Sequence, residues 1–227
     1  MFRPTKGRHE VKSRLLLISI VFITLALAGC PSVWNIDAKD TKESPEEAYK
    51  QAQDQLKDKK YFQAIESLEK LKSAYPDFKE MPQVYLKIAD AFFDEGSYDK
   101  AIARYLQFLE LYPNNEDVPR AKYQIGMAYF SQIKGTDLDN SVVRSAIQAF
   151  KVVTELQEPG EWGKKAEEKI NECKKKLAEK EIYKANTYIS LGNYKAARLA
   201  AQRVLDDYPK LGFDDVAQDL IKKYKNR

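Results

Sequence analysis

The stretch PQVYLKIADAFFDEGSYDKAIARYLQFLELYP, residues 82–113, decides the fold of this chain. Apolar residues recur at helical spacing before and after Gly96, which predicts two amphipathic helices joined by a short turn. Gly96 can adopt the positive φ that ends a helix, and Pro113 ends the second helix. Small Ala89 and Ala101 stand where the two helices must approach closely. The stretch therefore predicts a helix hairpin.

The hairpin pattern recurs along the chain. Tyr75-Pro76 and Tyr208-Pro209 close two further copies in the way that Tyr112-Pro113 closes the first, and a copy ending at Pro159 carries an extra loop. The spacing resembles that of the tetratricopeptide family. Hairpins this short must stack on one another to bury their apolar faces. We therefore expect an all-α fold, an α-solenoid of four to five tetratricopeptide-like helix hairpins.

Ordered structure is expected to begin at Ser44-Pro45-Glu46-Glu47, which has an N-cap residue, a proline at the first helical position and acids in the first turn. Residues 162–191 contain no proline and no glycine after Gly163, and they predict one long helix. The expected tetratricopeptide-repeat domain spans 44–227. Its units are about 44–76, 77–113, 114–159 and 160–209, followed by a cap helix in 210–227.

The amino terminus has the features of a secretory signal. A basic start is followed by an apolar run from Leu15 to Ala28, which is shorter than the roughly 20 residues that span a bilayer. Leu27-Ala28-Gly29-Cys30 resembles the bacterial lipobox. The resemblance implies a cleaved signal peptide at 1–29 and covalent lipid on Cys30; the alternative is an ordinary signal with a chance cysteine. Several acyl chains would anchor the chain stably in a membrane.

The residue after Cys30 is Pro31 rather than the aspartate that tends to retain such lipoproteins in the inner membrane. The resemblance to lipobox proteins therefore implies lipid anchoring in the outer membrane, with the protein facing the periplasm. Residues 30–43 are polar, with only two large apolar side chains, Trp34 and Ile36. We interpret them as a lipidated flexible tether.

The composition argues against several function classes. The chain has 38 basic and 34 acidic residues, and removal of 1–29 leaves 33 of each, so nucleic-acid binding loses its electrostatic support. The single histidine, His9, lies in the signal, which leaves no imidazole for catalysis or metal binding. Cys173 has no partner for an intrachain disulfide and shares an apolar helix face. We expect no enzyme activity, no metal and no cofactor other than the lipid.

Resemblance to the tetratricopeptide family also implies a peptide-binding groove. In that family the groove is lined by first-helix positions that are offset from the packing residues. Carried onto this chain, the large apolar side chains at these positions are Tyr49, Leu56, Leu86, Phe93, Tyr123, Met127 and Phe130. Large apolar residues on an open surface commonly mark a binding site. Two readings stay open: an apolar groove for peptides, or packing between helices or under the tether.

The lipobox, the segment SPEEAYKQAQDQLKDKKYFQAIESLEKL, the irregular third unit and the long helix running into EKEIYKANTYISLGNYKAARLAAQRVLDDYP together resemble the BamD family. BamD is the lipoprotein of the outer-membrane β-barrel assembly machinery. The resemblance implies binding to BamA through carboxy-terminal repeats, and association with other lipoproteins of the machinery. It also implies recognition of unfolded outer-membrane protein precursors through amino-terminal repeats.

For the BamA contact we expect outward positions of the fourth unit, namely Tyr194, Arg198 and Arg203. One departure from the family is the short tail, because only a single clear helix follows Pro209. An alternative function is that of a pilotin-type tetratricopeptide-repeat lipoprotein, which assists the assembly of a secretin or a pilus. A periplasmic enzyme or cell-wall factor is a third class, which the absence of histidine and of a nucleophile motif opposes.

Overall fold

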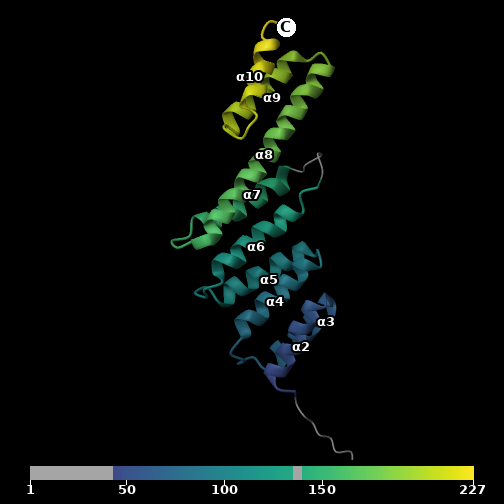
Figure 1. Cartoon of the computed structure of the whole chain (residues 1–227), viewed down its shortest axis with the longest axis vertical. Coiled ribbons are helices and arrows are strands. Elements are labelled where there is room, and N and C mark those ends of the chain that lie inside the picture. Colours follow the sequence, from purple (N-terminus) through teal and green to yellow (C-terminus); the bar gives the residue numbers. More distant parts are fainter. Residues whose placement is uncertain (1–42, 135–139) are drawn as a thin grey trace, which may run out of the picture. The chain divides into compact units, whose positions relative to one another are not determined.

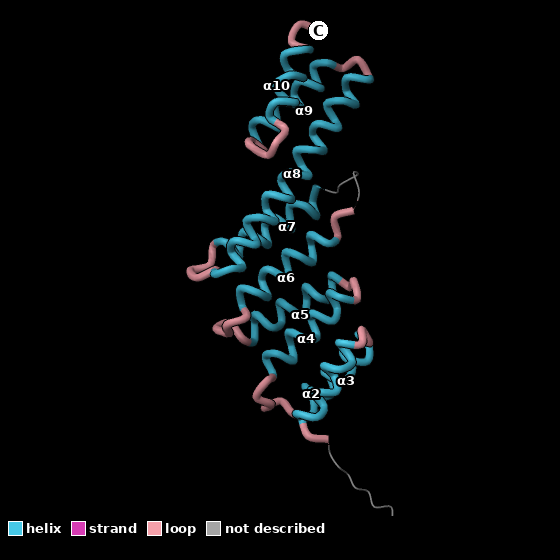
Figure 2. Tube along the Cα trace, in the orientation of Figure 1, coloured by secondary structure: helices cyan, strands magenta, loops and turns pink. Residues whose placement is uncertain are grey.

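The computed structural model describes residues 43–134 and 140–227. Cys30, the signal at 1–29, the tether up to residue 42 and the middle of the third-unit loop lie outside the described residues. Residues 44–227 form one compact unit. Within the described part, every regular element is a helix (Figure 2). The helices are α2 (Pro45–Lys57), α3 (Tyr61–Ala74), α4 (Met81–Asp94), α5 (Tyr98–Leu111), α6 (Val118–Ser131), α7 (Asn140–Thr154), α8 (Gly160–Ser190), α9 (Tyr194–Asp207) and α10 (Asp214–Lys223).

Each helix packs against the next one along the chain, from α2 to α10 (Figure 1). α6 also contacts α8, so a first helix touches the first helix of the following hairpin. This consecutive packing confirms the predicted solenoid of helix hairpins. The predicted long helix is also observed, because α8 runs without interruption over 31 residues. None of the described helices is both long enough and apolar enough to cross a membrane.

The first helix begins as the sequence predicts. Ser44 Oγ accepts a hydrogen bond from the Glu47 main-chain N–H at 3.2 Å, and Glu47 Oε2 accepts one from the Ser44 N–H at 3.2 Å. Pro45 occupies the first turn, where its missing N–H removes no helical hydrogen bond. This reciprocal capping satisfies main-chain donors that α2 would otherwise leave unpaired.

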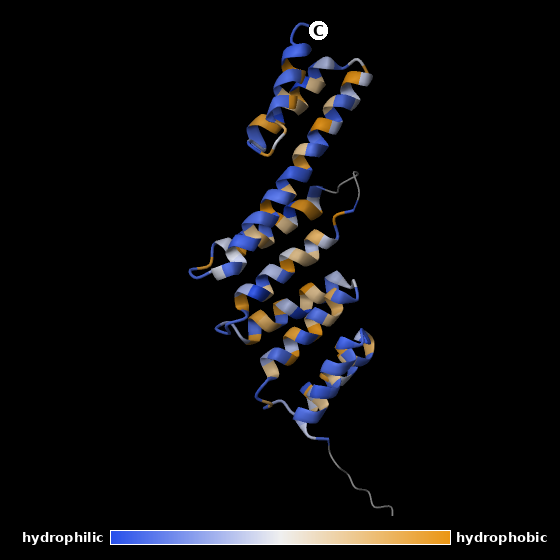
Figure 3. Ribbon diagram, in the orientation of Figure 1, coloured by the Kyte–Doolittle hydropathy of each residue, from blue (hydrophilic) through white to orange (hydrophobic). Residues whose placement is uncertain are grey.

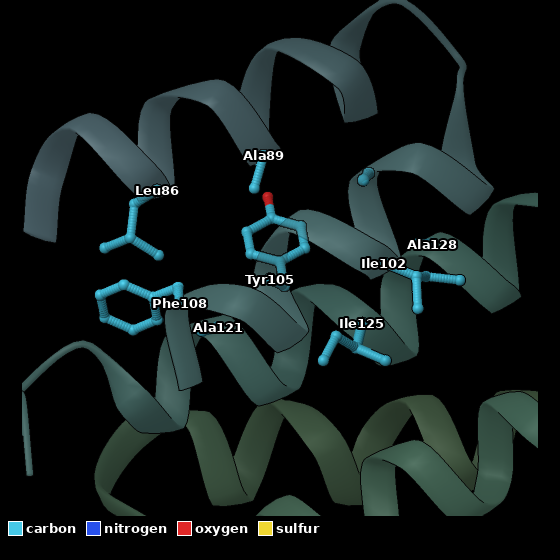
Figure 4. Packing of buried hydrophobic residues seen from close by; sticks show 9 residues of the cluster. Leu86, Ala89, Ile102, Tyr105, Phe108, Ala121, Ile125 and Ala128 are labelled. Atoms are coloured by element: carbon cyan, nitrogen blue, oxygen red, sulfur yellow. The ribbon is translucent and has the colours of Figure 1, made fainter. Parts of the chain in front are cut away.

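The core repeats one pattern in every second helix. The buried positions are Ala64, Leu68 and Leu71 in α3; Ala101, Tyr105 and Phe108 in α5; Ala146, Phe150 and Val153 in α7; and Ala197, Ala201 and Val204 in α9. The matching position in each first helix, five residues before its last residue, is small and buried: Ala52, Ala89, Gly126 and Ala185. Figure 4 shows the second of these sites, where Ala89 lies beside the ring of Tyr105.

Gly126 explains why this position is small. A Cβ atom added there would lie 2.5 Å from two ring carbons of Phe150. In the second hairpin Ala89 fits beside the Tyr105 ring, whereas in the third hairpin the Phe150 ring lies so close to α6 that only glycine fits. Hydrophobic residues are more frequent in α4 to α6 than along α8 and α10, which are mostly hydrophilic (Figure 3). The region from α4 to α6 is therefore more apolar than α8 and α10.

Three of the hairpin turns share one main-chain geometry. Gly96 has φ +85°, as predicted, and Gly192 has φ +72° at the equivalent place. In the first hairpin the same place is held by Lys59, with φ +58°. A side chain in this left-handed region is strained by contact between its Cβ atom and the carbonyl oxygen, at about 1–2 kcal/mol. The turn of the first hairpin therefore carries a local strain that the second and fourth avoid.

This difference predicts opposite effects of two substitutions. Lys59→Gly should raise the free energy of unfolding by about 0.5–1 kcal/mol, because glycine removes the strain but adds freedom to the unfolded chain. Gly96→Ala should lower it by about 1 kcal/mol, although open space surrounds the added methyl group. Urea unfolding followed by circular dichroism measures both. Changes of the same sign in the two variants would contradict the explanation.

Candidate partner-binding surfaces

The predicted groove positions lie on the first helices α2, α4 and α6, but they are not equivalent. Six of the seven side chains are partly exposed, and each packs along the edge of a buried cluster. Leu86 is different, because it is only 3% exposed and belongs to the core with Phe108 (Figure 4). The prediction that Leu86 lines a groove is therefore wrong. Its side chain is directed between α4 and α5 and not toward an open face.

The amino-terminal members of the set contact other aromatic rings at their edges. The Tyr49 ring lies edge-on to Phe78, with centroids 5.6 Å apart, and Phe93 lies edge-on to Tyr98 at 5.4 Å. Lys87 Nζ stands 6.0 Å from the Tyr49 centroid. Packing holds one side of each ring and leaves the remainder partly exposed. Such rings are rigid before binding, so a partner that covers them loses little conformational freedom.

A second group of rings joins α6 to the start of α8. Tyr123 lies 5.4 Å from Phe150 and 5.2 Å from Trp162, measured between ring centroids. Lys165 Nζ lies 4.2 Å from the Trp162 centroid, and Lys169 Nζ lies 4.9 Å from the Phe130 centroid. Phe150 is fully buried beneath this group. The other residues, together with Met127, are partly exposed and form a surface of aromatic rings and lysines.

The sequence placed Trp162 only at the start of the predicted long helix and indicated no role for Lys165 and Lys169. The position of Lys169 over the Phe130 ring was not predictable, because it depends on how α8 crosses α6, whereas Lys165 lies over a ring three residues earlier on its own helix.

A polar network that the sequence did not reveal links three helices. The Tyr105 hydroxyl donates to Asp90 Oδ1 at 2.5 Å, and Arg120 Nη2 donates to Asp90 Oδ2 at 2.5 Å. Asp90 belongs to α4, Tyr105 to α5 and Arg120 to α6. Burial and the Asp90 charge raise the pKa of Tyr105 well above its usual range, so the hydroxyl stays a donor. Burial, and then Asp90, also raise the pKa of Asp94. The network fixes the relative position of the second and third hairpins.

The three residues expected to contact a partner at the carboxy-terminal end have different surroundings. Tyr194 stacks on Tyr224 with a centroid distance of 5.0 Å and an interplanar angle of 8°. Arg198 Nη1 donates to the main-chain oxygens of Tyr224 at 2.6 Å and Arg227 at 2.9 Å. The expectation that Arg198 points outward is therefore wrong, because its guanidinium holds the end of α10 against α9. The BamA contact itself stays a prediction.

Arg203 keeps the outward position that was expected. Its side chain is 61% exposed, and Nη1 lies 3.5 Å from Glu181 Oε2. Glu181 is the one buried charged residue in the described part of the chain. Its Oε1 accepts from Lys184 Nζ at 2.5 Å, whereas Oε2 has no hydrogen-bond partner. Arg203 therefore contributes a charge to a buried carboxylate and still presents most of its side chain to solvent.

The described residues offer no group of three or more side chains arranged to hold a metal ion. Cys173 is fully buried and free, which confirms the expected buried thiol. Burial raises its pKa to about 11, so the thiolate that would act as a nucleophile is scarce at neutral pH.

A family model described as "YfiO: Outer membrane lipoprotein" matches residues 41–226. The match covers the whole helical array. The chain belongs to this family. The assignment supports a BamD-like role at the family level and association with the outer membrane, and the family is an accessory lipoprotein family that is not a known enzyme class. A search of curated proteins found no match.

The buried network predicts a specific loss of stability. Tyr105→Phe removes the hydroxyl donor from Asp90 and should lower the free energy of unfolding by about 1.5–3 kcal/mol, as expected for a hydrogen bond to a charged group. Tyr98→Phe is the matched control, since Tyr98 is half-buried on the same helix and packs against Phe93. It should change stability by less than about 0.5 kcal/mol. Urea unfolding measures both variants. An equal loss of unfolding free energy in Tyr105→Phe and Tyr98→Phe would show that the hydrogen bond to Asp90 contributes nothing.

The burial of Cys173 predicts how its thiol reacts. In a Cys30→Ser variant, which leaves Cys173 as the single cysteine, a thiol reagent should label the native protein at least about 100-fold more slowly than the urea-unfolded protein at pH 8. Stability should also fall as pH rises from about 8.5 to 11, because the unfolded thiol ionises before the folded one. Rapid labelling of the native protein would contradict the buried position.

Proposed function

We propose that this protein is a non-catalytic component of the β-barrel assembly machinery, anchored in the outer membrane by lipid on Cys30 and facing the periplasm. It binds BamA through the hairpin α8–α9 and the adjoining α10, and it works with other lipoproteins of the machinery. Its amino-terminal first helices recognise unfolded outer-membrane protein precursors. The observation that carries the proposal is membership of the outer-membrane lipoprotein family over residues 41–226.

The surface of the first helices supports precursor recognition. Tyr49, Phe93 and Phe130 each keep part of a ring exposed while its other side is fixed by neighbours. Unfolded precursors of barrel proteins expose apolar and aromatic side chains, and these gain most by burial against preformed rings. The partly exposed set is Tyr49, Leu56, Phe93, Tyr123, Met127 and Phe130. Leu86 has no part in the proposal.

The carboxy-terminal surface supports a separate partner contact. Arg203 is the exposed member of the three residues expected there, while Tyr194 and Arg198 hold α10 in place. Their proposed role in binding BamA is thus indirect, through the position of α10. Two partners at opposite ends of the sequence would let the array hold a precursor near the barrel protein that inserts it.

The proposal predicts different crosslinks at two positions. A photoreactive residue replacing Phe93 should capture unfolded barrel precursors in intact cells, and one replacing Arg203 should capture BamA. Lys70 in α3 is the control position, because its side chain is 75% exposed and its ion pair with Glu66 stays on its own helix. Captured proteins are identified by mass spectrometry.

Capture of a secretin or a pilin, with no BamA at position 203, would contradict the proposal and favour a pilotin. The same set of captured proteins at all three positions would show that the contacts are nonspecific.

A further inference from the structure

The turn of the first hairpin, between α2 and α3, carries side chains that the packing of the array does not use. Lys59 and Lys60 belong to the turn, and Phe62 is the second residue of α3. Phe62 is 71% exposed, and within residues 43–134 and 140–227 it belongs to none of the hydrophobic clusters or ring pairs. Lys59, Lys60 and Phe62 together form the first-hairpin tip.

Two other hairpins show what this turn requires. The helices α3, α5 and α9 each begin at a tyrosine, so their turns can be compared residue by residue. The places of the tip are held in the second hairpin by Gly96, Ser97 and Asp99, and in the fourth by Gly192, Asn193 and Lys195. The first place suits glycine, whereas Lys59 adopts φ +58° under strain, and the third place is polar except at Phe62. Backbone strain that the fold does not need commonly marks a functional site.

The two cations of the tip are open to a partner. Lys59 is near enough to Asp94 for an electrostatic interaction, but it takes part in none of the ion pairs found among the described residues. Lys60 pairs with Asp58 at 2.8 Å, yet 57% of its side chain is exposed, and exposed pairs of this kind are weak. Ammonium groups beside an exposed ring suit a lipid–water interface, because the ring enters the apolar layer while the ammonium groups contact phosphates.

The proposed lipid anchor brings the first-hairpin tip within reach of a membrane. Cys30 precedes Ser44 by 14 residues, and an extended chain of that length spans at most about 50 Å. Helix α2 has 13 residues, so the turn lies about 20 Å from Ser44. The chain between Cys30 and α2 is therefore long enough for the tip to touch the surface in which lipid on Cys30 would lie.

We propose that the first-hairpin tip contacts a phospholipid surface, with the Phe62 ring among the acyl chains and Lys59 and Lys60 on lipid phosphates. The tip and the lipid on Cys30 then hold the amino-terminal hairpin against the membrane at two points instead of one. A single ring and two lysines bind weakly alone, but anchoring raises their effective concentration at the surface. The inference rests on the proposed function for the anchor that supplies this proximity.

Photocrosslinking to lipid tests this contact without any partner protein. A hexahistidine tag replaces residues 1–30 and binds nickel-chelating lipid in vesicles of phosphatidylethanolamine and phosphatidylglycerol, so anchoring does not depend on Cys30. Benzoylphenylalanine replaces Phe62 and keeps an aromatic ring there. It should crosslink to phospholipid at least about fivefold more often than the same residue at Lys70 or Leu191. Lys70 lies about 12 Å further along α3, and Leu191 is 73% exposed beside the turn of the fourth hairpin.

A matched pair of variants tests the role of Lys59. With benzoylphenylalanine at position 62, Lys59→Gly should lower the yield of lipid crosslinks at least about threefold, because one ammonium group is lost from the tip. Lys210→Gly is the control, since Lys210 is the other non-glycine residue with positive φ, +63°, in the described part of the chain. It removes the same charge and the same kind of strain from the loop after α9, and it should leave the yield unchanged. Lys59→Gly is expected to be more stable than the parent chain, so unfolding does not explain its loss of contact.

Equal yields of lipid crosslinks at positions 62, 70 and 191 would overturn the proposal, and so would equal effects of Lys59→Gly and Lys210→Gly. Crosslinks from position 62 to a second copy of the chain, without lipid crosslinks, would overturn it in favour of self-association. Mass spectrometry of the protein from cells tests separately whether Cys30 carries lipid. Lipid crosslinks at position 62 of the tagged chain, together with an unmodified Cys30 in cells, would support this inference while contradicting the proposed anchor. The two proposals therefore fail separately.

Discussion

The structure depends on a close approach of two helices that is repeated in each hairpin. A small residue near the end of the first helix, Ala52, Ala89, Gly126 or Ala185, faces the buried side chains of the second helix. At Gly126 the Phe150 ring occupies the space that a Cβ atom would need. A larger residue would force the helices apart and open a gap that no neighbouring side chain fills. The close approach of the two helices also decides which residues lie on the surface, because each helix exposes only the side that its neighbouring helices do not cover.

Stacking on this frame creates polar contacts that hold neighbouring helices in one arrangement. Asp90 receives hydrogen bonds from Tyr105 and Arg120, which belong to two different helices. At the other end of the array, Glu181 is neutralised by Lys184 and Arg203, and Arg198 holds the end of α10. Buried or half-buried charges of this kind are costly when one partner is removed. These charged contacts therefore act together with the apolar contacts to determine which helices pack against each other.

The surface of the amino-terminal first helices and the surface at the carboxy-terminal end differ in physical character, because different helices cover them. The first helices α2, α4 and α6 present aromatic rings that are packed on one side and exposed on the other. Such rings suit apolar segments of varied sequence. The carboxy-terminal surface instead presents Arg203, which is mostly exposed and lies beside the buried carboxylate of Glu181.

The sequence alone determined the helix hairpins, the turn at Gly96 and the small residues Ala89 and Ala101 of the second hairpin. Helical spacing, Gly96 at its turn and the Tyr-Pro endings are local signals, so a wrong assignment would have required a strong tertiary override. Tertiary structure decided which faces stay open. Leu86 is buried and Arg198 is occupied because helices from other parts of the chain cover them, and the Asp90–Tyr105–Arg120 network joins residues up to 30 positions apart. The rotation and crossing of packed helices set these contacts, and helical periodicity carries no information about either.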